Sequence, residues 1–496
     1  MNRFRTESAA PRVIALALLF AAAGIFEAAH RPSLRSLAGA DFWWHLRTGL
    51  GILQDRVLPY TGLYSQRSDM PWVASSWLYD VSVAIGFRVL DLRILPLAAI
   101  ACKFALAVLT FLLAGGLRRR FWPAVFLSAV AQYVLFGLPP LPAYVSALLF
   151  AVMLLLLSHS RAANSVRPLY FLPLLFLLWA NLDVQFVVGI FALLLFNLTA
   201  ILRGWGTQLG PTWVEDSVRP QFRARYLALG ASLFAAVLTP YGAAGYRLFF
   251  AQVTSAANAY FLDFQALRFR SPHDYLLLLL VAAAFLALGM RRARDPFPIL
   301  LLLLCAFAAF YARRDAWLAV LAALSVLGDA LPETVPQSSD TPTARAPSYF
   351  FLAAALACIL LAAAAVIHLP RGRQAMLAEL GKTYPVAAAD FIRQHQLPPP
   401  LFNSLPWGGF LAWYLPEYPV AIDGRTALYG DDFNLQYAQV MNAETHFSTF
   451  PALSQAGTLL LEKDSLMGVA LATVPGFKVA YSDNVAVVLV REQSQP

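Results

Sequence analysis

Charged residues are scarce in this sequence of 496 residues, of which Asp, Glu, Lys and Arg together make up only 13%. A soluble globular protein carries about 25% charged residues. Apolar residues make up 59% of the chain, and the mean hydropathy is +0.61. Because so few charges cannot cover a soluble surface, most of the surface is expected to face lipid. The composition therefore predicts a membrane protein rather than a set of soluble domains.

Cysteine is also scarce, and this excludes two kinds of site. The sequence contains three cysteines, Cys102, Cys305 and Cys358, and each lies inside an apolar run. Their spacing fits no metal motif and no two of them share a hydrophilic segment, so buried free thiols are expected. The sequence also lacks an internal repeat of the kind that many transporters carry, and it lacks a recognisable nucleotide-sugar signature.

Acidic residues are fewer than basic ones, and the formal net charge is +9. This excess does not indicate a nucleic-acid partner, because the basic residues stand in short clusters between apolar runs. Arg118-Arg119-Arg120 and Arg291-Arg292 are two such clusters. In membrane proteins, basic clusters mark the cytoplasmic loops. The charge pattern therefore predicts the topology of the chain, and no nucleic-acid partner is expected.

The apolar runs between these clusters predict about eleven membrane-spanning helices. They cover residues 13–29, 94–115, 121–136, 143–158, 169–182, 186–202, 226–239, 275–290, 297–312, 317–331 and 348–369. With a cytoplasmic N-terminus, the basic loops fall inside, together with a Pro-, Ser- and Thr-rich linker at 332–347. An alternative for the first run is a cleaved signal peptide. The predicted location is a bacterial inner (cytoplasmic) membrane.

Three sizeable segments are predicted to lie outside. The first covers residues 30–93, the second runs from residue 240 to about residue 274, and the third is the tail from about residue 370. In the tail, patterns typical of helices alternate with patterns typical of strands, at 387–395, 401–403, 409–415, 419–422, 433–442, 458–461, 477–481 and 485–491. We therefore predict a mostly α protein. A transmembrane helical bundle occupies residues 1–369, and a small extracytoplasmic α/β domain occupies residues 370–496.

The first outer segment opens with the motif D-F-W-W-H-L-R at residues 41–47, in a chain that is otherwise poor in charge. The predicted topology puts Asp41 at the outer membrane surface. Trp43 and Trp44 either belong to an interfacial aromatic belt or stack on a sugar or an isoprenoid chain. His45 stands four residues after Asp41, so both lie on one helical face. It is either a hydrogen-bonded structural residue or a ligand of a divalent ion such as Mg²⁺ or Mn²⁺.

These residues resemble the GT-C superfamily, whose members are polytopic glycosyltransferases that use polyprenyl-phosphate-linked sugars. The resemblance spans nearly the whole chain and rests on short motifs at residues 41–49, 59–65, 72, 77–78, 179–181, 240–242, 402–403, 408–413 and 422–429. It implies an uncharacterised bacterial branch with a D-x-W-W-H-L motif in the first outer loop. The chain departs from that branch at three positions. Gly62 replaces an acid, Asp263 replaces a Glu, and the His expected near Asp183 is missing.

Transfer of a sugar from a lipid phosphate needs a base for the acceptor hydroxyl and cations for the departing phosphate. The predicted base is Asp41, and the resemblance adds Asp263 as a second catalytic carboxylate. The alternative for Asp41 is an acid that stabilises the N-terminus of an interfacial helix. If a divalent ion is bound, His45 with Asp263 or Asp183 would hold it. No spacing in the sequence demands the ion.

The predicted substrate-binding residues are Trp43, Trp44, His45, Asp183, Arg313, Arg314, Asp423 and Arg425. Arg313 and Arg314 stand in a predicted outer turn, although basic clusters normally mark cytoplasmic loops. They are candidates for phosphate binding, because a guanidinium binds phosphate with two parallel hydrogen bonds. The alternative is a pair of snorkelling side chains with Asp315 as counter-ion. Asp183 either caps a helix or lines the site. Asp423 and Arg425 either face a ligand or form a local ion pair that holds a turn.

The sequence as a whole predicts a membrane glycosyltransferase. Its partners would be a polyprenyl-phosphate sugar donor and membrane lipid, and its acceptor a glycan, lipid or protein on the outer face. One alternative is a transporter or flippase of a lipid-linked substrate. Another is a non-catalytic member that presents its tail to a partner, which the missing acid at Gly62 keeps open.

Overall fold

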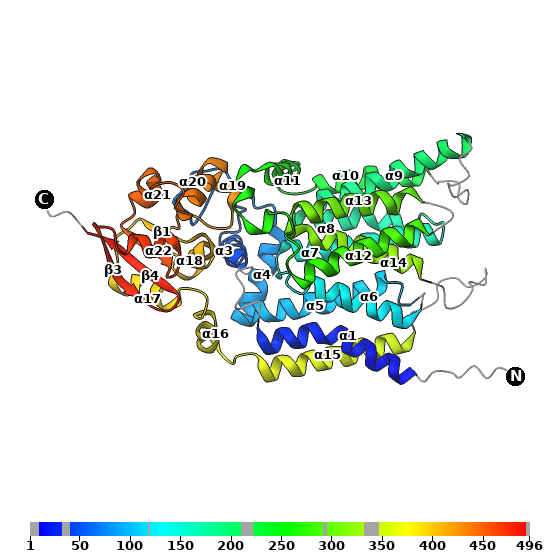
Figure 1. Cartoon of the computed structure of the whole chain (residues 1–496), viewed down its shortest axis with the longest axis horizontal. Coiled ribbons are helices and arrows are strands. Elements are labelled where there is room, and N and C mark those ends of the chain that lie inside the picture. Colours follow the sequence, from blue (N-terminus) through cyan, green and yellow to red (C-terminus); the bar gives the residue numbers. More distant parts are fainter. Residues whose placement is uncertain are drawn as a thin grey trace.

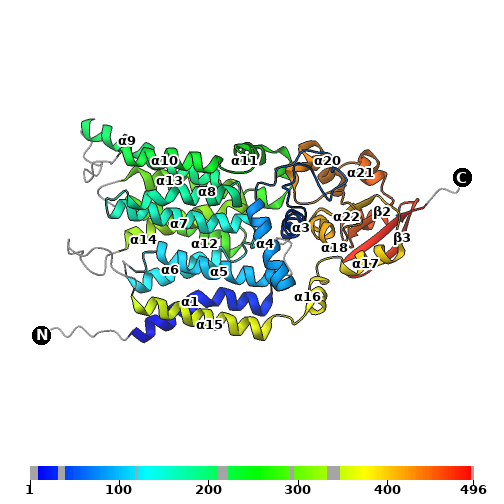
Figure 2. The same cartoon turned by 180° about the vertical axis from the view of Figure 1, so that it is seen from behind.

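A computed structural model describes residues 9–31, 40–117, 120–209, 222–290, 295–331 and 347–492. Figure 1 shows a long bundle of helices at one end and a smaller region with a β-sheet at the other. Helices α3 (Ala40–Asp55) and α4 (Trp77–Leu90) lie between them, and the view from behind in Figure 2 shows the same order. The predicted fold class, a mostly α bundle with a small C-terminal sheet region, is confirmed.

Each of the eleven predicted runs overlaps one described α-helix of the bundle. These are α1 (Ala9–His30), α5 (Ile94–Leu113), α6 (Phe121–Val134), α7 (Pro142–Ala162), α8 (Leu172–Leu182), α9 (Phe186–Leu209), α10 (Phe222–Val237), α12 (Pro272–Gly289), α13 (Pro296–Tyr311), α14 (Ala316–Ala330) and α15 (Ser348–His368). In the described ranges, five helical stretches are long and apolar enough to cross a membrane, namely 9–30, 77–113, 142–162, 272–289 and 348–368. The chain is therefore a multi-pass membrane protein.

The helix at the edge of the bundle, α15, shows how composition places a helix against lipid. Its small residues Ala353 and Ala357 are fully buried against α1, where Gly24 leaves room for Leu361. Its opposite face exposes large apolar side chains, including Ile367, which is 71% exposed. Small residues let helix backbones approach closely inside a membrane, while apolar bulk is favourable toward lipid.

The prediction puts the N-terminus on one side of the membrane and the first outer segment and the tail on the other side. The first residues of α1 lie at the end of the bundle away from the sheet, whereas α3 and the sheet lie beyond the other end (Figure 1). The basic residues Arg118, Arg119, Arg291 and Arg292 lie outside the described residues, as does most of the linker predicted at 332–347.

An ion pair lies buried among the apolar helices, where the sequence pattern did not reveal one. Glu27 of α1 and Lys103 of α5 are 1% and 6% exposed, and Lys103 Nζ lies 3.7 Å from Glu27 Oε2. The same ammonium donates a hydrogen bond of 2.8 Å to the carbonyl of Phe136 and lies 3.9 Å from the centre of its ring. The buried charge is thus satisfied on several sides.

Replacing Lys103 with Met is therefore expected to destabilise the protein. It leaves the carboxylate of Glu27 without its cation, and breaking a buried ion pair from one side costs about 3–5 kcal/mol. The measurement is the unfolding temperature in detergent. Lys382→Met is the matched control, because Lys382 pairs with Glu379 while its side chain is 61% exposed. Equal losses for the two variants would contradict the prediction.

The tail contains a four-stranded sheet in the order β1-β2-β4-β3. The strands are β1 (Leu401–Asn403), β2 (Thr458–Glu462), β3 (Phe477–Ser482) and β4 (Ala486–Arg491). Strand β1 runs parallel to β2, and the other two pairs are antiparallel. The tail also contains the helices α16 (Arg373–Leu380), α17 (Val386–His395), α18 (Leu405–Tyr414), α19 (Thr426–Tyr429), α20 (Asp431–Met441), α21 (Pro451–Ser454) and α22 (Leu466–Leu471).

One strand predicted in the tail, at residues 419–422, is wrong. Val420 forms only an isolated parallel bridge, and its partner is Ser65 of the first outer segment. The backbone N–H of Gln66 donates to the carbonyl of Val420, and the N–H of Val420 donates to the carbonyl of Tyr64. The apolar run is buried as predicted, but its backbone partner comes from a distant part of the chain.

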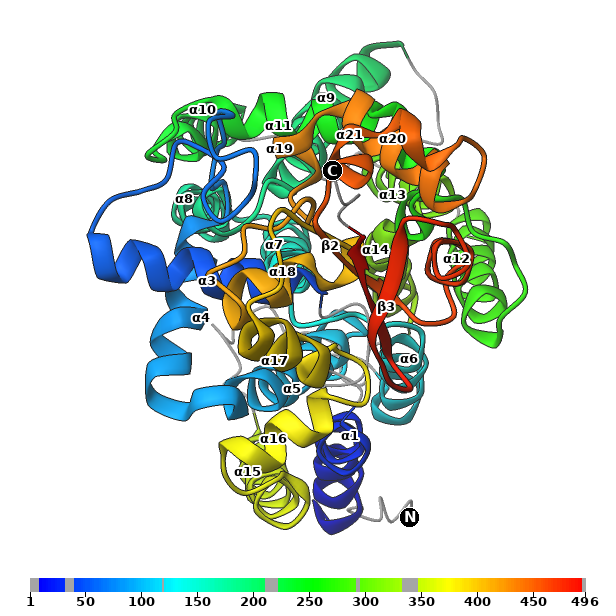
Figure 3. The same cartoon turned by 90° about the vertical axis from the view of Figure 1, so that its left-hand side faces the viewer.

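Helix α3 joins the tail to the bundle. It packs against α4 on one side and α18 on the other, and the view from the tail end in Figure 3 shows α18 lying over α3. Phe42 and Leu46 share one hydrophobic core with Phe410 of the tail. The boundary predicted between residues 369 and 370 falls just after the end of α15. This hydrophobic core contains residues from both sides of that boundary.

Candidate active site

Asp41, the predicted base, lies in the first turn of α3. Its side chain is half-buried, and its Oδ1 accepts a hydrogen bond of 3.2 Å from Nε1 of Trp44. The tail reaches the same oxygen. A Cβ atom on Gly424 would lie only 1.7 Å from Asp41 Oδ1. Only a glycine lets the tail backbone come so close to this carboxylate.

The surroundings raise the pKa of Asp41 above its ordinary value. Burial is the largest cause, because it disfavours the charged form. The charge of His45 and the hydrogen bond from Trp44 act in the opposite direction, and the charges of Asp263 and Asp423 raise the pKa further. A carboxylate with a raised pKa is a stronger base when it is ionised.

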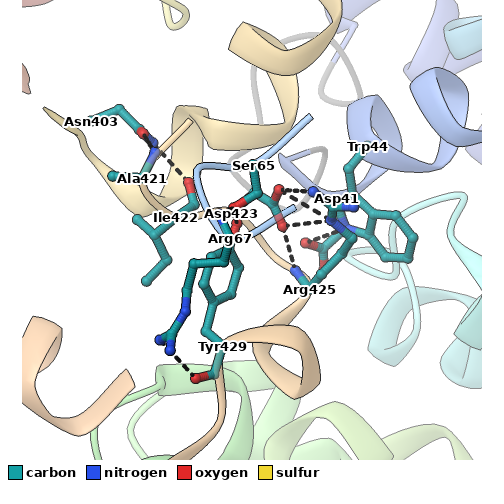
Figure 4. A network of polar contacts seen from close by, with 10 residues as sticks. All are labelled: Asp41, Trp44, Ser65, Arg67, Asn403, Ala421, Ile422, Asp423, Arg425 and Tyr429. Atoms are coloured by element: carbon teal, nitrogen blue, oxygen red, sulfur yellow. Dashed lines mark hydrogen bonds and ion pairs between the residues drawn. The ribbon is translucent and has the colours of Figure 1, made fainter. Parts of the chain in front are cut away.

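The turn that covers Asp41 is held by an ion pair between Asp423 and Arg425. The carboxylate of Asp423 accepts from Nε and Nη2 of Arg425, at 3.0 and 2.7 Å, and also from the backbone N–H of Arg425 at 2.9 Å. Both side chains are buried, and the guanidinium lies 4.9 Å from the ring centre of Trp72. Figure 4 shows this pair beside Asp41 and Trp44.

Asn403 positions this turn from the end of β1. Its side-chain amide donates to the carbonyl of Ile422 at 2.8 Å and its oxygen accepts from the N–H of Ala421 at 2.9 Å (Figure 4). On the other side, a Cβ on Gly408 would lie 2.0 Å from the carbonyl oxygen of Ile422. The glycine-rich stretch of the tail therefore makes room for the turn.

The first outer segment is hydrogen-bonded to Tyr429, which follows the same turn. The hydroxyl of Tyr429 donates to Ser65 Oγ at 3.2 Å, and Nη1 of Arg67 donates to the carbonyl of Tyr429 at 3.4 Å (Figure 4). Neither Ser65 nor Arg67 is among the predicted site residues. No signal within either short segment could reveal that they meet.

The two adjacent tryptophans have different surroundings. Trp43 is fully buried and stacks on Trp413 with ring centres 4.8 Å apart, and it also touches Phe410 and Tyr384. It presents no exposed face to a substrate, so its interpretation as a sugar platform is corrected to a core residue. Trp44 is half-buried and lies beside Asp41.

His45 is held by Asp80, which is not among the predicted site residues. Its Nδ1 lies 2.5 Å from Oδ1 of Asp80 in α4, and both side chains are buried. Among the described residues, no three His, Cys, Asp or Glu side chains gather to form a metal site. The ligand set suggested for a divalent ion therefore does not fit this geometry, and we derive no step through such an ion.

Asp183 and Arg314 lie on a neighbouring set of turns. Asp183 Oδ2 accepts a hydrogen bond of 2.6 Å from Ser146, and burial raises its pKa while Ser146 and the charge of Arg314 lower it. Arg314 Nε lies 3.6 Å from Asp315, which also accepts from Gln185 at 2.8 Å. Asp315 is thus the counter-ion of Arg314, one member of the arginine pair.

The last two predicted residues are exposed. Asp263 lies in the short 3₁₀ helix η5 (Leu262–Phe264), and its charge acts on Asp41. Arg313 is exposed, and its backbone N–H donates to the carbonyl of Gln265 in the segment after η5. The turn between α13 and α14 and the segment around Asp263 are therefore joined directly.

The described residues thus form one group around Asp41 and a second group around Arg314. Trp44, Asp263 and Asp423 act directly on Asp41, and the charge of His45 acts on both Asp41 and Asp183. This geometry offers a half-buried carboxylate at the end of the bundle, and Arg313 and Arg314 stand on a turn that is hydrogen-bonded to the segment after Asp263. Such an arrangement suits proton removal beside an anionic group.

Comparison with solved structures identifies the fold. Archaeal oligosaccharyltransferase AglB from Archaeoglobus fulgidus, in complex with an inhibitory peptide and a dolichol-phosphate, superposes with a TM-score of 0.50 at 10% identity, over 100% of this chain and 75% of that chain. ArnT from Cupriavidus metallidurans bound to undecaprenyl phosphate gives a TM-score of 0.48 at 14% identity, over 98% of both chains. No protein-family model and no curated protein matches the chain. The chain shares the fold of AglB, in agreement with the fold that the resemblance to the GT-C superfamily implies.

Proposed function

We propose that this protein is a membrane glycosyltransferase that moves a sugar from a polyprenyl-phosphate-linked donor to an acceptor on the outer face of the membrane. The acceptor is a glycan, a lipid or a protein. The observation that carries the proposal is the half-buried carboxylate of Asp41, which a turn of the tail covers at one end of a bundle that shares the fold of AglB. The structure of AglB holds a dolichol-phosphate, a lipid of the proposed donor class.

In the proposed reaction, Asp41 takes the proton of the acceptor hydroxyl. The hydroxyl oxygen then bonds to the anomeric carbon of the sugar while the bond from that carbon to the phosphate oxygen breaks. The electron pair leaves with the lipid phosphate, and the configuration of the sugar inverts. Proton transfer by a positioned side chain contributes about 10²–10⁴-fold to such reactions.

The departing phosphate gains negative charge and needs cations nearby. We assign this role to Arg313 and Arg314. Arg313 is exposed, and its turn is hydrogen-bonded to the segment after Asp263. Arg314 lies beside Asp315, and this neighbouring carboxylate orients the guanidinium of Arg314. We assign Asp423 and Arg425 the role of holding the turn that covers Asp41.

The raised pKa of Asp41 predicts a particular pH dependence. A base must be ionised, so kcat/KM falls as the pH drops through the pKa of Asp41. Because burial and the charges of Asp263 and Asp423 raise that pKa, the acid limb of the profile is expected above the ordinary range of aspartate, about 3.9. Asp263→Asn removes one charge that raises the pKa, so its acid limb is expected at lower pH. A limb that moves to higher pH in this variant would contradict the assignment.

The experiment that tests the function uses the purified full-length protein with a panel of polyprenyl-phosphate sugars. The expected result is consumption of one donor, with the sugar recovered on an added acceptor. If the protein instead moved intact donor across a vesicle membrane without cleaving it, the transporter alternative would replace the proposal. If no donor in the panel were cleaved or moved, the non-catalytic alternative would be favoured.

A further inference from the structure

A chain of contacts leads from a buried acid on α4 to the proposed base on α3. Asp80 has no exposed surface, and its Oδ1 lies 2.5 Å from Nδ1 of His45. The imidazole stacks on the indole of Trp44 with ring centres 3.5 Å apart and an angle of 28° between the planes. The same indole donates its N–H to Asp41 at 3.2 Å. Each member therefore constrains the next.

The helix packing makes this chain of contacts rigid at its buried end. A Cβ on Gly49 would lie 1.9 Å from the carbonyl oxygen of Asp80, so α3 and α4 approach closely at this level. The ring of Tyr79 packs edge-on against His45 with centres 5.0 Å apart. The imidazole is thus held by Asp80, Trp44 and Tyr79 on different sides.

We propose that Asp80 is a positioning residue for the transfer reaction, which orients His45 and through it the Trp44 indole that hydrogen-bonds to Asp41. The inference rests on the proposed role of Asp41 as the base. A carboxylate that orients a histidine fixes which ring nitrogen carries the proton. Here Asp80 contacts Nδ1 of His45, and the face of the imidazole ring stacks on Trp44. Oδ2 of Asp80 is buried and has no hydrogen-bond partner in the described part of the chain.

Other titratable or charged groups also face these contacts. They are Tyr79 from α4, Asp183 from the turn after α8, Asp263 from η5, Tyr384 from the segment before α17, and Asp423 and Arg425 from the tail. None of them is changed in the experiment below, so their effect on Asp41 is common to all variants.

The test measures protonation of Asp41 without relying on transfer activity. A hydrophobic carbodiimide reacts with protonated carboxyl groups, so the pH midpoint of labelling on the peptide that contains Asp41, measured by mass spectrometry, reports its ionisation. In Asp80→Asn the midpoint is expected to move to higher pH, because Asp41 loses the well-placed hydrogen bond from Trp44 that favours its charged form. We also expect kcat to fall about tenfold or more while KM for the donor changes little.

Two further variants keep the test decisive. Trp44→Phe retains the stacked ring but loses the indole N–H, so it is expected to shift the labelling midpoint in the same direction as Asp80→Asn. Asp55→Asn is the matched control, because Asp55 is exposed at the far end of α3. An unchanged labelling midpoint in Trp44→Phe would overturn the proposal. An unchanged labelling midpoint in Asp80→Asn would also overturn it, provided that this variant elutes from a sizing column as a folded protein. So would a shifted midpoint with wild-type kcat.

The two proposals fail in different ways. If the wild-type protein cleaves no donor, the proposed function fails, and the labelling midpoints still decide whether Asp80 acts on Asp41. If the wild-type protein transfers sugar and Asp80→Asn matches it in both labelling and kcat, only the positioning role fails.

Discussion

Replacing Asp41 with Asn is expected to lower kcat by about 10³-fold, within the range that general base catalysis contributes. The variant keeps the size of the side chain but cannot take the proton of the acceptor. KM for the donor is expected to change little, because the proposed phosphate contacts lie on Arg313 and Arg314. The measurement is donor cleavage under single-turnover conditions with the donor that the wild-type protein uses.

The same variant separates a base from a helix-stabilising acid. In the first turn of α3, a negative charge would favour the helix by about 0.3–1 kcal/mol. The raised pKa of Asp41 points the other way, since it means that the folded protein disfavours the charge. The unfolding temperature of Asp41→Asn at pH 7 is therefore expected to equal or exceed that of the wild type. A clear loss of stability, with kcat unchanged, would identify Asp41 as a structural residue.

Asp55→Asn serves as the control for charge removal on the same helix. Asp55 is exposed in the last turn of α3, outside the contacts around Asp41. Its replacement is expected to leave kcat at the wild-type level. A similar loss in both variants would mean that α3 as a whole, rather than the carboxylate of Asp41, supports the reaction.

Adding one methyl group at Gly424 is expected to have the second largest effect. A Cβ there would lie 1.7 Å from Asp41 Oδ1 and 3.1 Å from Nε1 of Trp44. Either the carboxylate rotates or the turn at Asp423 and Arg425 retreats, and a misplacement of about 1 Å at a reacting group can cost about 10²-fold. Gly424→Ala is therefore expected to lower kcat about 100-fold, measured with the same donor.

Gly230→Ala is the matched control for this change. Gly230 lies in α10, and a Cβ there would meet no atom within 4 Å. The control is expected to keep wild-type activity. If Gly424→Ala also kept wild-type kcat, the tail turn would not form a wall of the site, and the role of the tail in the proposed reaction would have to be abandoned.

The helices could be predicted from the sequence because their signal is local. Each long apolar run overlaps one described helix of the bundle, and in the tail the apolar runs at β1, β2 and the hairpin of β3 and β4 coincide with the observed strands. The run at 419–422 fails for a physical reason. Burial of apolar residues is visible in the sequence, but the backbone partner of Val420 is Ser65, more than three hundred residues away.

The candidate site divides in the same way. Asp41 and Trp44 stood out in the sequence because polar and aromatic residues are conspicuous beside a predicted span. Asp80 did not stand out, since an acid near an apolar helix gives no sign of whether a histidine faces it. Trp43 and Trp44 are identical residues next to each other in the sequence, so only the tertiary packing distinguishes them. Trp43 lies in the core against Trp413, whereas Trp44 lies beside Asp41.

By itself, the sequence determined that this protein is a helical membrane protein with a hydrophilic tail and an acidic motif after its first span. These properties follow from composition and from periodicity over short stretches, which depend on local side chains alone. Only the tertiary structure decided that the tail turn covers Asp41, with Gly424 against the carboxylate, and that Asp80 holds His45. Those contacts arise from the packing of α3 between α4 and α18, which joins segments that the linear sequence keeps far apart.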